Sequence, residues 1–196
     1  MGEKSEQKKQ FILETARKVF TEKGYKSVTM KDIVDACEIS RGGLYLYFDS
    51  TEQLFMEVLK MEQADTDDTL EDALSKEATV TDILALFLKE QKKEILRGTN
   101  NLSIATYEFF FSKKFPKKEN IARKKFELGV KLLSEMIDAG VANGEFFCED
   151  SVAVGKNIMF VIEGLKVAAR TIGVSEKTVD EQLLYMIQGL VYEEEE

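Results

Sequence analysis

The sequence contains no histidine, no tryptophan and one proline, Pro116, among its 196 residues. The absence of histidine removes the side chain that most often acts as a general base near neutral pH and most often binds metal ions. The chain also lacks the G-x-S-x-G, G-x-G-x-x-G, Walker and C-x-x-C motifs. We therefore predict that the protein is not an enzyme, and we assign it no catalytic residue, no metal and no cofactor.

Cysteine and long apolar segments are also scarce. Cys37 and Cys148 are the only cysteines, which is too few for a disulfide framework, and we expect no redox role for either. No segment approaches the roughly 20 apolar residues that span a bilayer. The first ten residues are polar and mixed in charge, unlike a signal peptide. We therefore expect a cytoplasmic protein that has no membrane partner.

The apolar residues recur at helical spacing along most of the chain. The spacing predicts a first helix over about 5–23, which Gly24 ends, and two short helices capped by Thr29 and Ser40. A fourth helix begins near Thr51, and the acidic, weakly apolar residues 64–79 favour its end and a loop. Further helices are expected over about 80–97, 101–114, 118–143, 150–173 and 176–192. The fold class is therefore all-α, with about nine helices.

Charge is distributed unevenly along the chain. The formal net charge is −9, yet residues 1–50 hold nine Lys or Arg against eight Asp or Glu. The excess of acid therefore lies in residues 51–196. An acidic body is compatible with DNA binding, because only the docked face must meet phosphates.

The two short helices and their turn at Glu38 and Ile39 have the pattern of a helix-turn-helix. The second of them presents Ser40, Arg41, Gly42, Gly43, Tyr45 and Leu46 outward. Arg41 can reach a guanine edge or a phosphate, and Tyr45 can touch a thymine methyl group. The two glycines allow a close backbone approach, and the helix that begins after Thr29 directs its N-terminus at phosphate. On spacing alone, a plain helical corner with a polar surface is the alternative.

Residues 29–54, TMKDIVDACEISRGGLYLYFDSTEQL, resemble the signature of the tetracycline-repressor (TetR) family. The segment ARKVFTEKGY just before them is similar to the end of that family's first helix, so the resemblance covers roughly the first 60 residues. Val34 and Glu38 depart from the usual alanine and glycine, and Leu46 and Thr51 stand where phosphate-contacting residues are frequent. The resemblance implies a DNA-binding set of Thr29, Ser40, Arg41, Gly42, Gly43, Tyr45, Leu46, Tyr47 and Thr51.

The resemblance also implies a division into two domains. Residues 1–50 would form the three-helix DNA-binding domain, and residues 51–196 a helical effector-binding and dimerisation domain, with the fourth helix connecting the two. The last two helices carry apolar stripes that either form a four-helix bundle with a second copy or face their own core. The predicted dimer interface is Ile158, Val161, Leu165, Ala168, Ile172, Val179, Leu183, Met186 and Leu190.

Aromatic residues in the C-terminal part favour an apolar ligand cavity, for which simple core packing is the alternative. The candidate lining residues are Tyr107, Glu108, Phe111, Phe126, Met136, Phe160 and Glu163, and Glu108 or Glu163 would suit a cationic ligand. The basic stretch 113–125 is interrupted by Pro116 and Glu119, and we interpret it as a solvated loop and helix start.

These observations together predict a homodimeric transcriptional regulator whose partners are double-stranded operator DNA and a small-molecule effector of unknown identity. The expected mechanism is repression at a palindromic operator, relieved by a small apolar or amphipathic ligand. An activator or co-repressor-dependent regulator of the same fold remains open, as does a helical interaction module that has lost DNA binding.

Overall fold

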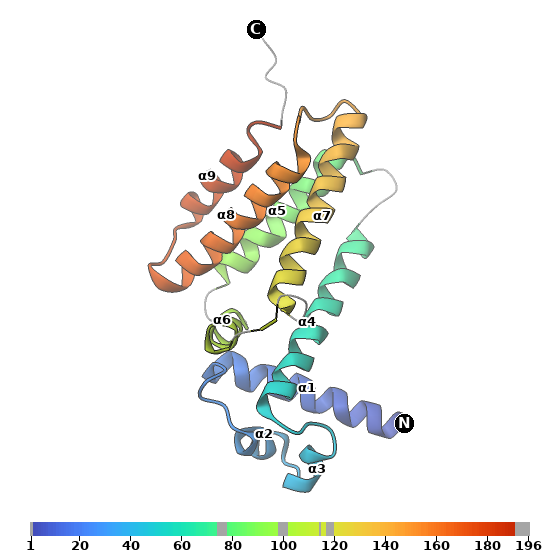
Figure 1. Ribbon diagram of the computed structural model, residues 1–196, viewed down its shortest axis with the longest axis vertical. Coiled ribbons are helices and arrows are strands. Elements are labelled where there is room, and N and C mark those ends of the chain that lie inside the picture. The colour runs from blue at the N-terminus through green and yellow to red at the C-terminus, as the bar shows by residue number, and fades with distance from the viewer. Residues whose placement is uncertain (1, 74–77, 98–101, 114, 117–119, 191–196) are drawn as a thin grey trace. The chain divides into compact units, whose positions relative to one another are not determined.

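The computed structural model describes residues 2–73, 78–97, 102–113, 115–116 and 120–190, with side chains omitted for residues 63–73. These residues form nine helices and no strand, so the predicted all-α class is confirmed (Figure 1). The helices are α1 (Glu3–Lys23), α2 (Met30–Cys37), α3 (Arg41–Tyr45), α4 (Thr51–Ala73), α5 (Val80–Leu96), α6 (Ser103–Ser112), α7 (Ile121–Ala142), α8 (Ser151–Thr171) and α9 (Glu176–Ile187).

The chain divides into two compact units. Their boundaries differ from the division at residue 50 that the family resemblance implies. The first unit contains residues 1–73 and 99–114, and the second contains residues 74–98 and 115–196. The first therefore gains α4 and α6, because both of these helices pack on α1. The chain passes between the units three times, once on each side of α5 and once after α6.

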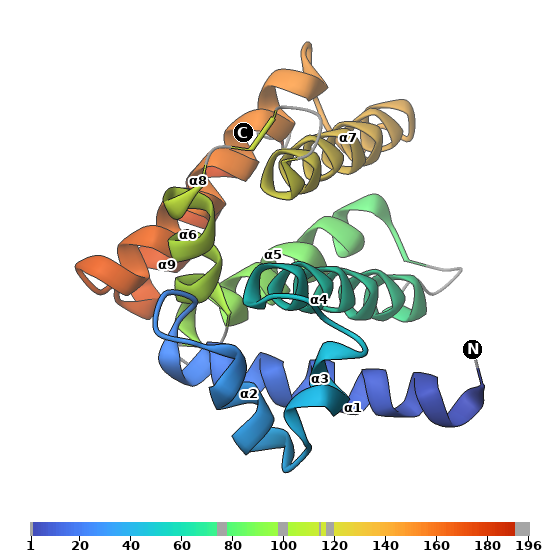
Figure 2. The same ribbon diagram turned by 60° about the horizontal axis from the view of Figure 1, so that its bottom comes forward.

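The core of the first unit is built on α1, whose apolar stripe is buried against α2, α4 and α6. Ile33 and Cys37 of α2 and Leu44 of α3 close the core on one side. Figure 2 shows α2 and α3 following one another along α1. The buried residues that α1 and α4 contribute are Ile12, Leu13, Ala16, Val19, Phe20, Leu54, Phe55 and Val58.

An aromatic cluster joins α6 to this core. The Phe109 ring centroid lies 4.8 Å from that of Tyr25 and 5.1 Å from that of Phe55, which in turn lies 4.7 Å from that of Phe20. Two polar contacts add to the attachment. The carboxylate of Glu108 accepts a hydrogen bond from the backbone N–H of Lys26 at 3.0 Å, and Lys113 pairs with Glu52 of α4. Helix α6 is thus an integral part of the first unit.

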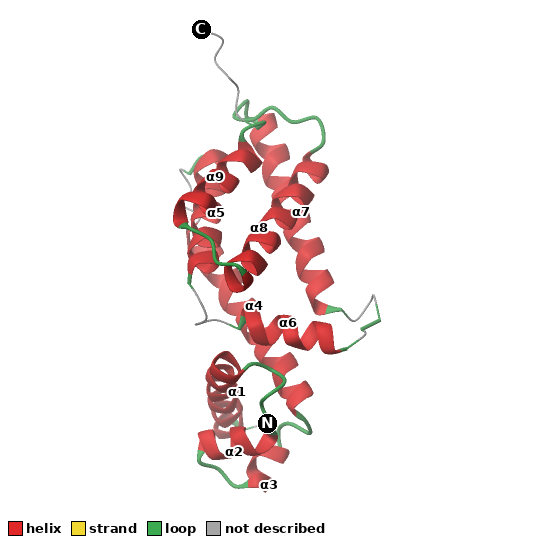
Figure 3. Cartoon of the chain, turned by 90° about the vertical axis from the view of Figure 1, so that its left-hand side faces the viewer, coloured by secondary structure: helices red, strands yellow, loops and turns green. Residues whose placement is uncertain are grey.

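The second unit packs α5, α7, α8 and α9 around a continuous apolar core (Figure 3). Helices α7 and α8 approach closely at Gly155, where an added Cβ would lie 3.1 Å from the carbonyl oxygen of Val130. The loop after α7 holds the start of α5, because Glu145 accepts hydrogen bonds from the backbone N–H groups of Val80 and Thr81. These bonds satisfy amides that a helix N-terminus leaves unpaired, and they lower the pKa of Glu145.

Two boundaries differ from the sequence-based expectation. Helix α4 continues to Ala73 instead of ending near residue 64, since residues 64–73 contain neither glycine nor proline to stop it. Helix α9 ends at Ile187, before the predicted residue 192. None of the helices in the described ranges combines the length and apolar character that a membrane span requires.

Candidate nucleic-acid interface

Helix α2 begins with the predicted cap. The Thr29 hydroxyl accepts a hydrogen bond from the backbone N–H of Asp32, and the Asp32 carboxylate accepts one from the backbone N–H of Thr29 at 2.9 Å, which completes a capping box. Lys23 of α1 also binds Asp32, with 2.6 Å between Nζ and Oδ1. The bonds from Lys23 and Thr29 hold the pKa of Asp32 well below its usual range. The exposed Thr29 side chain is therefore engaged in fixing the helix start.

Glu38 forms the turn between α2 and α3 in the left-handed conformation, with φ 52° and ψ 38°. Residues other than glycine, asparagine and aspartate rarely adopt this backbone conformation, because their Cβ atom crowds the backbone. Glycine is the usual residue at this position of the TetR pattern that the sequence resembles, and the left-handed backbone at Glu38 accounts for that preference.

Helix α3 begins at Arg41, after Ser40, whose hydroxyl accepts a hydrogen bond from the backbone N–H of Gly43 at 3.1 Å. The two glycines that follow have different surroundings. A Cβ added to Gly43 would lie 3.2 Å from the Ser40 oxygen, whereas a Cβ added to Gly42 would meet no described atom within 4 Å. The close contact with the capping Ser40 side chain explains why position 43 is a glycine. Packing within the chain does not explain the glycine at position 42.

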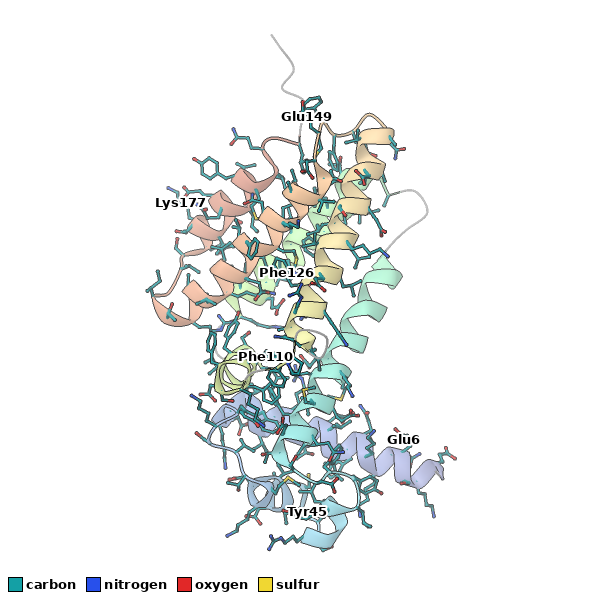
Figure 4. All side chains as sticks on the ribbon, in the orientation of Figure 1. Glu6, Tyr45, Phe110, Phe126, Glu149 and Lys177 are labelled. Atoms are coloured by element: carbon teal, nitrogen blue, oxygen red, sulfur yellow. The ribbon has the colours of Figure 1, made fainter. Side chains whose placement is uncertain are left out.

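The exposed face of α3 combines a cation, an aromatic ring and an aliphatic side chain. The guanidinium of Arg41 lies 5.6 Å from the ring centroid of Tyr45, a cation–π arrangement. Leu46, the C-cap residue of α3, is 83% exposed, and Figure 4 shows Tyr45 on the helix itself. We call Arg41, Gly42, Tyr45 and Leu46 the α3 surface. This surface can contact the phosphate backbone and the base edges of a nucleic acid at the same time.

Two other residues of the predicted set lie beyond α3. The Tyr47 hydroxyl accepts a hydrogen bond from the Ser5 hydroxyl at 3.3 Å, so Tyr47 braces α3 against α1. Thr51 is half-buried in the first turn of α4, where Ser50 accepts a hydrogen bond from the backbone N–H of Gln53 at 3.2 Å. The adjacent Glu52–Lys113 pair was not expected from the sequence, because its partners lie 61 residues apart.

Two family models match the chain. Residues 12–58 match the family described as "Bacterial regulatory proteins, tetR family", and residues 83–180, half of the chain, match the "Tetracyclin repressor-like, C-terminal domain". The chain belongs to the TetR family. The match to the N-terminal model includes α2 and α3 in full, with the turn between them. Members of the TetR family are DNA-binding transcriptional regulators and not enzymes.

Comparison with individual proteins agrees with this assignment. The chain is 30% identical over 138 residues to the uncharacterized HTH-type transcriptional regulator YfiR of Bacillus subtilis, a match that covers 69% of this chain and 66% of YfiR, just under two thirds of its length. A TetR-family regulator from Agrobacterium tumefaciens shares the fold with a TM-score of 0.77 and 17% identity, over 96% of this chain and 100% of that one. A transcriptional regulator from Saccharomonospora viridis, in complex with choline, has a TM-score of 0.79 at 20% identity, over 94% and 98%.

The residues predicted to line a ligand cavity are divided between the two units of this TetR-family chain. Tyr107, Glu108 and Phe111 belong to the first unit, where the Glu108 carboxylate is engaged by Lys26. Phe126 and Phe160 meet in the second unit, with ring centroids 4.7 Å apart. The remaining two candidates also lie there: Met136 packs against the apolar core, and Glu163 pairs with Lys166. The ligand site therefore stays a prediction, and its second-unit part is centred on Phe126 and Phe160.

The predicted dimer interface stays a prediction, and its residues differ in how far they are buried within one protomer. Six of its nine residues are buried in the second unit's own core, namely Ile158, Leu165, Val179, Leu183, Met186 and Leu190. Their side chains pack within their own protomer. Val161 and Ala168 are partly buried, and Ile172 is exposed. The exposed apolar residues of α8 and α9 that the sequence analysis did not single out are Val152, Val167, Leu184 and Tyr185.

Replacing Glu38 with glycine should stabilise the first unit and strengthen DNA binding. Glycine adopts the left-handed conformation without the Cβ penalty, so we expect a gain of up to about 1 kcal/mol in the free energy of unfolding. The loss of one negative charge near the DNA adds to affinity. Thermal unfolding and DNA titration measure the two effects. Glu38→Gln, which removes only the charge, should raise affinity without raising stability; equal unfolding temperatures for both variants would contradict the conformational part.

Replacing Gly42 with alanine should have opposite effects on stability and on DNA binding. Alanine is the better helix former, and the added Cβ meets no described atom, so stability should rise by about 0.5–1 kcal/mol. DNA affinity should fall, because the methyl group occupies space that the DNA would fill. The increase in stability is an internal control for folding. An unchanged affinity would show that the backbone at Gly42 does not approach DNA.

Proposed function

We propose that the protein is a homodimeric repressor that places the α3 helix of each protomer in the major groove of a palindromic operator. The observation that carries the proposal is the α3 surface. Leu44 and Phe48 are buried and anchor the segment, while Arg41, Gly42 and Leu46 are exposed on it. The buried residues hold the backbone of this segment in place, and its exposed residues are accessible to DNA.

The chemistry of this surface suits the major groove. A guanidinium donates two parallel hydrogen bonds to the O6 and N7 atoms of guanine, or binds a phosphate. The ring of Tyr45 beneath Arg41 favours a fixed orientation for this group, which reduces the entropy lost on binding. Gly42 allows the first turn of α3 to approach the DNA closely.

A palindromic operator requires two such surfaces related by a two-fold axis, about 34 Å apart. We propose that α8 and α9 supply the dimer interface through their exposed apolar side chains, Val167, Ile172, Leu184 and Tyr185. Gly164 is exposed on α8 with no described atom within 4 Å of an added Cβ, and it allows helices of two protomers to approach closely.

We further propose that a small apolar or amphipathic ligand binds the second unit and releases the repressor in the cytoplasm. Release requires only that the ligand bind one conformation more tightly than the other. Phe126 and Phe160 offer the apolar part of such a site. The α6 segment lies between two of the chain's passages from unit to unit, so a ligand-induced change in the second unit has a covalent path to the first.

Selection of bound fragments from genomic DNA, followed by footprinting, tests this proposal. We expect two protected half-sites with inverted sequence, centred about one helical turn apart, and a dimer in sedimentation at micromolar concentration. Deletion of the gene should increase transcription from the bound promoter. A monomer that protects a single site, or transcription that falls on deletion, would contradict the homodimeric repressor.

A further inference from the structure

Leu46 is an exposed aliphatic side chain on the proposed DNA-binding surface, and its backbone is anchored. It lies at the C-terminal end of α3, where its backbone N–H donates to the carbonyl oxygen of Gly42 at 3.1 Å. Leu44 and Phe48, two residues to either side, are fully buried. With both neighbours anchored, the Leu46 side chain remains 83% exposed.

An aliphatic group has few partners on DNA. Leucine has no hydrogen-bond donor, so it gains nothing from a phosphate or from the polar atoms of guanine, adenine and cytosine edges. The C5-methyl group of thymine is the apolar feature that the major groove presents. A single exposed leucine needs no explanation elsewhere on a protein, but this one is the C-cap residue of the five-residue helix that carries Arg41 and Tyr45.

We propose that Leu46 selects a thymine in each operator half-site by burying its side chain against the thymine methyl group. The proposal rests on the proposed DNA-binding function and adds a sequence requirement to it. Arg41 and Leu46 are five residues apart, about 7.5 Å along a helix, and successive base pairs are about 3.4 Å apart. The half-site should therefore contain the thymine within about three base pairs of the base pair that Arg41 contacts.

Replacement of each operator thymine by deoxyuridine tests the contact, because this change removes the methyl group and keeps base pairing. At one thymine in each half-site, we expect affinity for the wild-type protein to fall about three- to fivefold per half-site, the effect of one buried methyl group. Leu46→Ala should bind the thymine operator with a similar loss and should be indifferent to deoxyuridine at that position. Changing the same pair to 5-methylcytosine and guanine should retain more affinity than unmethylated cytosine.

The matched control is Leu128→Ala, which shortens an exposed leucine on α7 of the second unit and should keep the full dependence on the thymine methyl group. Thermal unfolding of Leu46→Ala should match that of the wild type, because the side chain packs against little of the chain. If the wild type binds a specific operator but Leu46→Ala shows the same deoxyuridine effect at every thymine, the assignment of Leu46 is wrong and DNA binding stands. If no specific operator exists, the proposed function fails and this assignment fails with it.

Discussion

Replacing Phe109 with alanine should destabilise the first unit by about 3–5 kcal/mol, the usual cost of removing a buried phenylalanine. Phe109 is fully buried, and its ring lies within 5.3 Å, centroid to centroid, of the rings of Tyr25, Phe55 and Phe110. Its helix lies far along the chain from α1 and α4, yet its loss should expose their amides. Hydrogen exchange monitored by mass spectrometry measures the effect segment by segment.

The control for this experiment is Phe111→Ala, two residues further along the same helix. Phe111 is 82% exposed, so its removal should change stability by no more than about 0.5 kcal/mol, as at other surface positions. In the Phe109→Ala protein, amides of α1 and α4 should exchange faster, while those in the centre of α8 keep most of their protection. Full protection of α1 in that variant would show that α6 does not belong to the core of the first unit.

Replacing Glu94 with glutamine should destabilise the second unit by about 2 kcal/mol, whereas replacing its partner Lys166 with methionine should cost less than about 1 kcal/mol. Lys166 is 7% exposed, and its Nζ lies 3.1 Å from Oε2 of Glu94 and 3.6 Å from Oε1 of Glu163. In Glu94→Gln, the nearly buried ammonium group keeps a neutral acceptor at position 94, and its one remaining ion pair among these contacts is the longer one to Glu163. Without Lys166, the partly exposed Glu94 carboxylate can be hydrated, and methionine fills the site with apolar atoms.

The pair also gives a pH dependence. Burial alone would raise the pKa of Glu94, but the charge and hydrogen bond of Lys166 outweigh burial and hold the pKa below its ordinary value. The pair therefore contributes stability above about pH 4.3, the unfolded pKa of glutamate, and the contribution is lost as acid titrates the folded carboxylate.

Urea unfolding of the two single variants and the double variant measures the free energies of unfolding on which this prediction rests. The double variant should resemble Lys166→Met, and equal losses in the two single variants would contradict the asymmetry.

The local features of the DNA-binding unit could be predicted from the sequence because they depend on neighbouring residues. A capping box joins Thr29 to Asp32, three positions away, and the cap at Ser40 reaches Gly43. Gly24 ends α1 with φ 75°, which glycine adopts without strain. The spacing of residue types carries this information directly, and the same stretch carries the resemblance to the TetR family.

The long-range features could not be predicted in this way. The bond between Glu108 and Lys26 spans 82 residues, and no periodicity within α6 shows that this helix joins the first unit. An apolar stripe shows that a helix face is covered but does not show what covers it. The stripes that contain Leu165 and Leu183 therefore predict a dimer interface and packing in their own core equally well, and the structure shows the core packing. The Lys166–Glu94 pair was missed for the same reason, since its partners lie on different helices.

The most direct test of DNA recognition by α3 is fluorescence anisotropy of the protein on its selected operator and on random DNA, at increasing salt. We expect a preference for the operator of about 10³-fold or more and weaker binding as salt rises. Arg41→Ala should lower operator affinity about tenfold or more, whereas Arg123→Ala, the same change at an exposed position on α7, should leave it unchanged. Equal and weak binding to both DNAs, or operator binding that Arg41→Ala does not alter, would contradict the account.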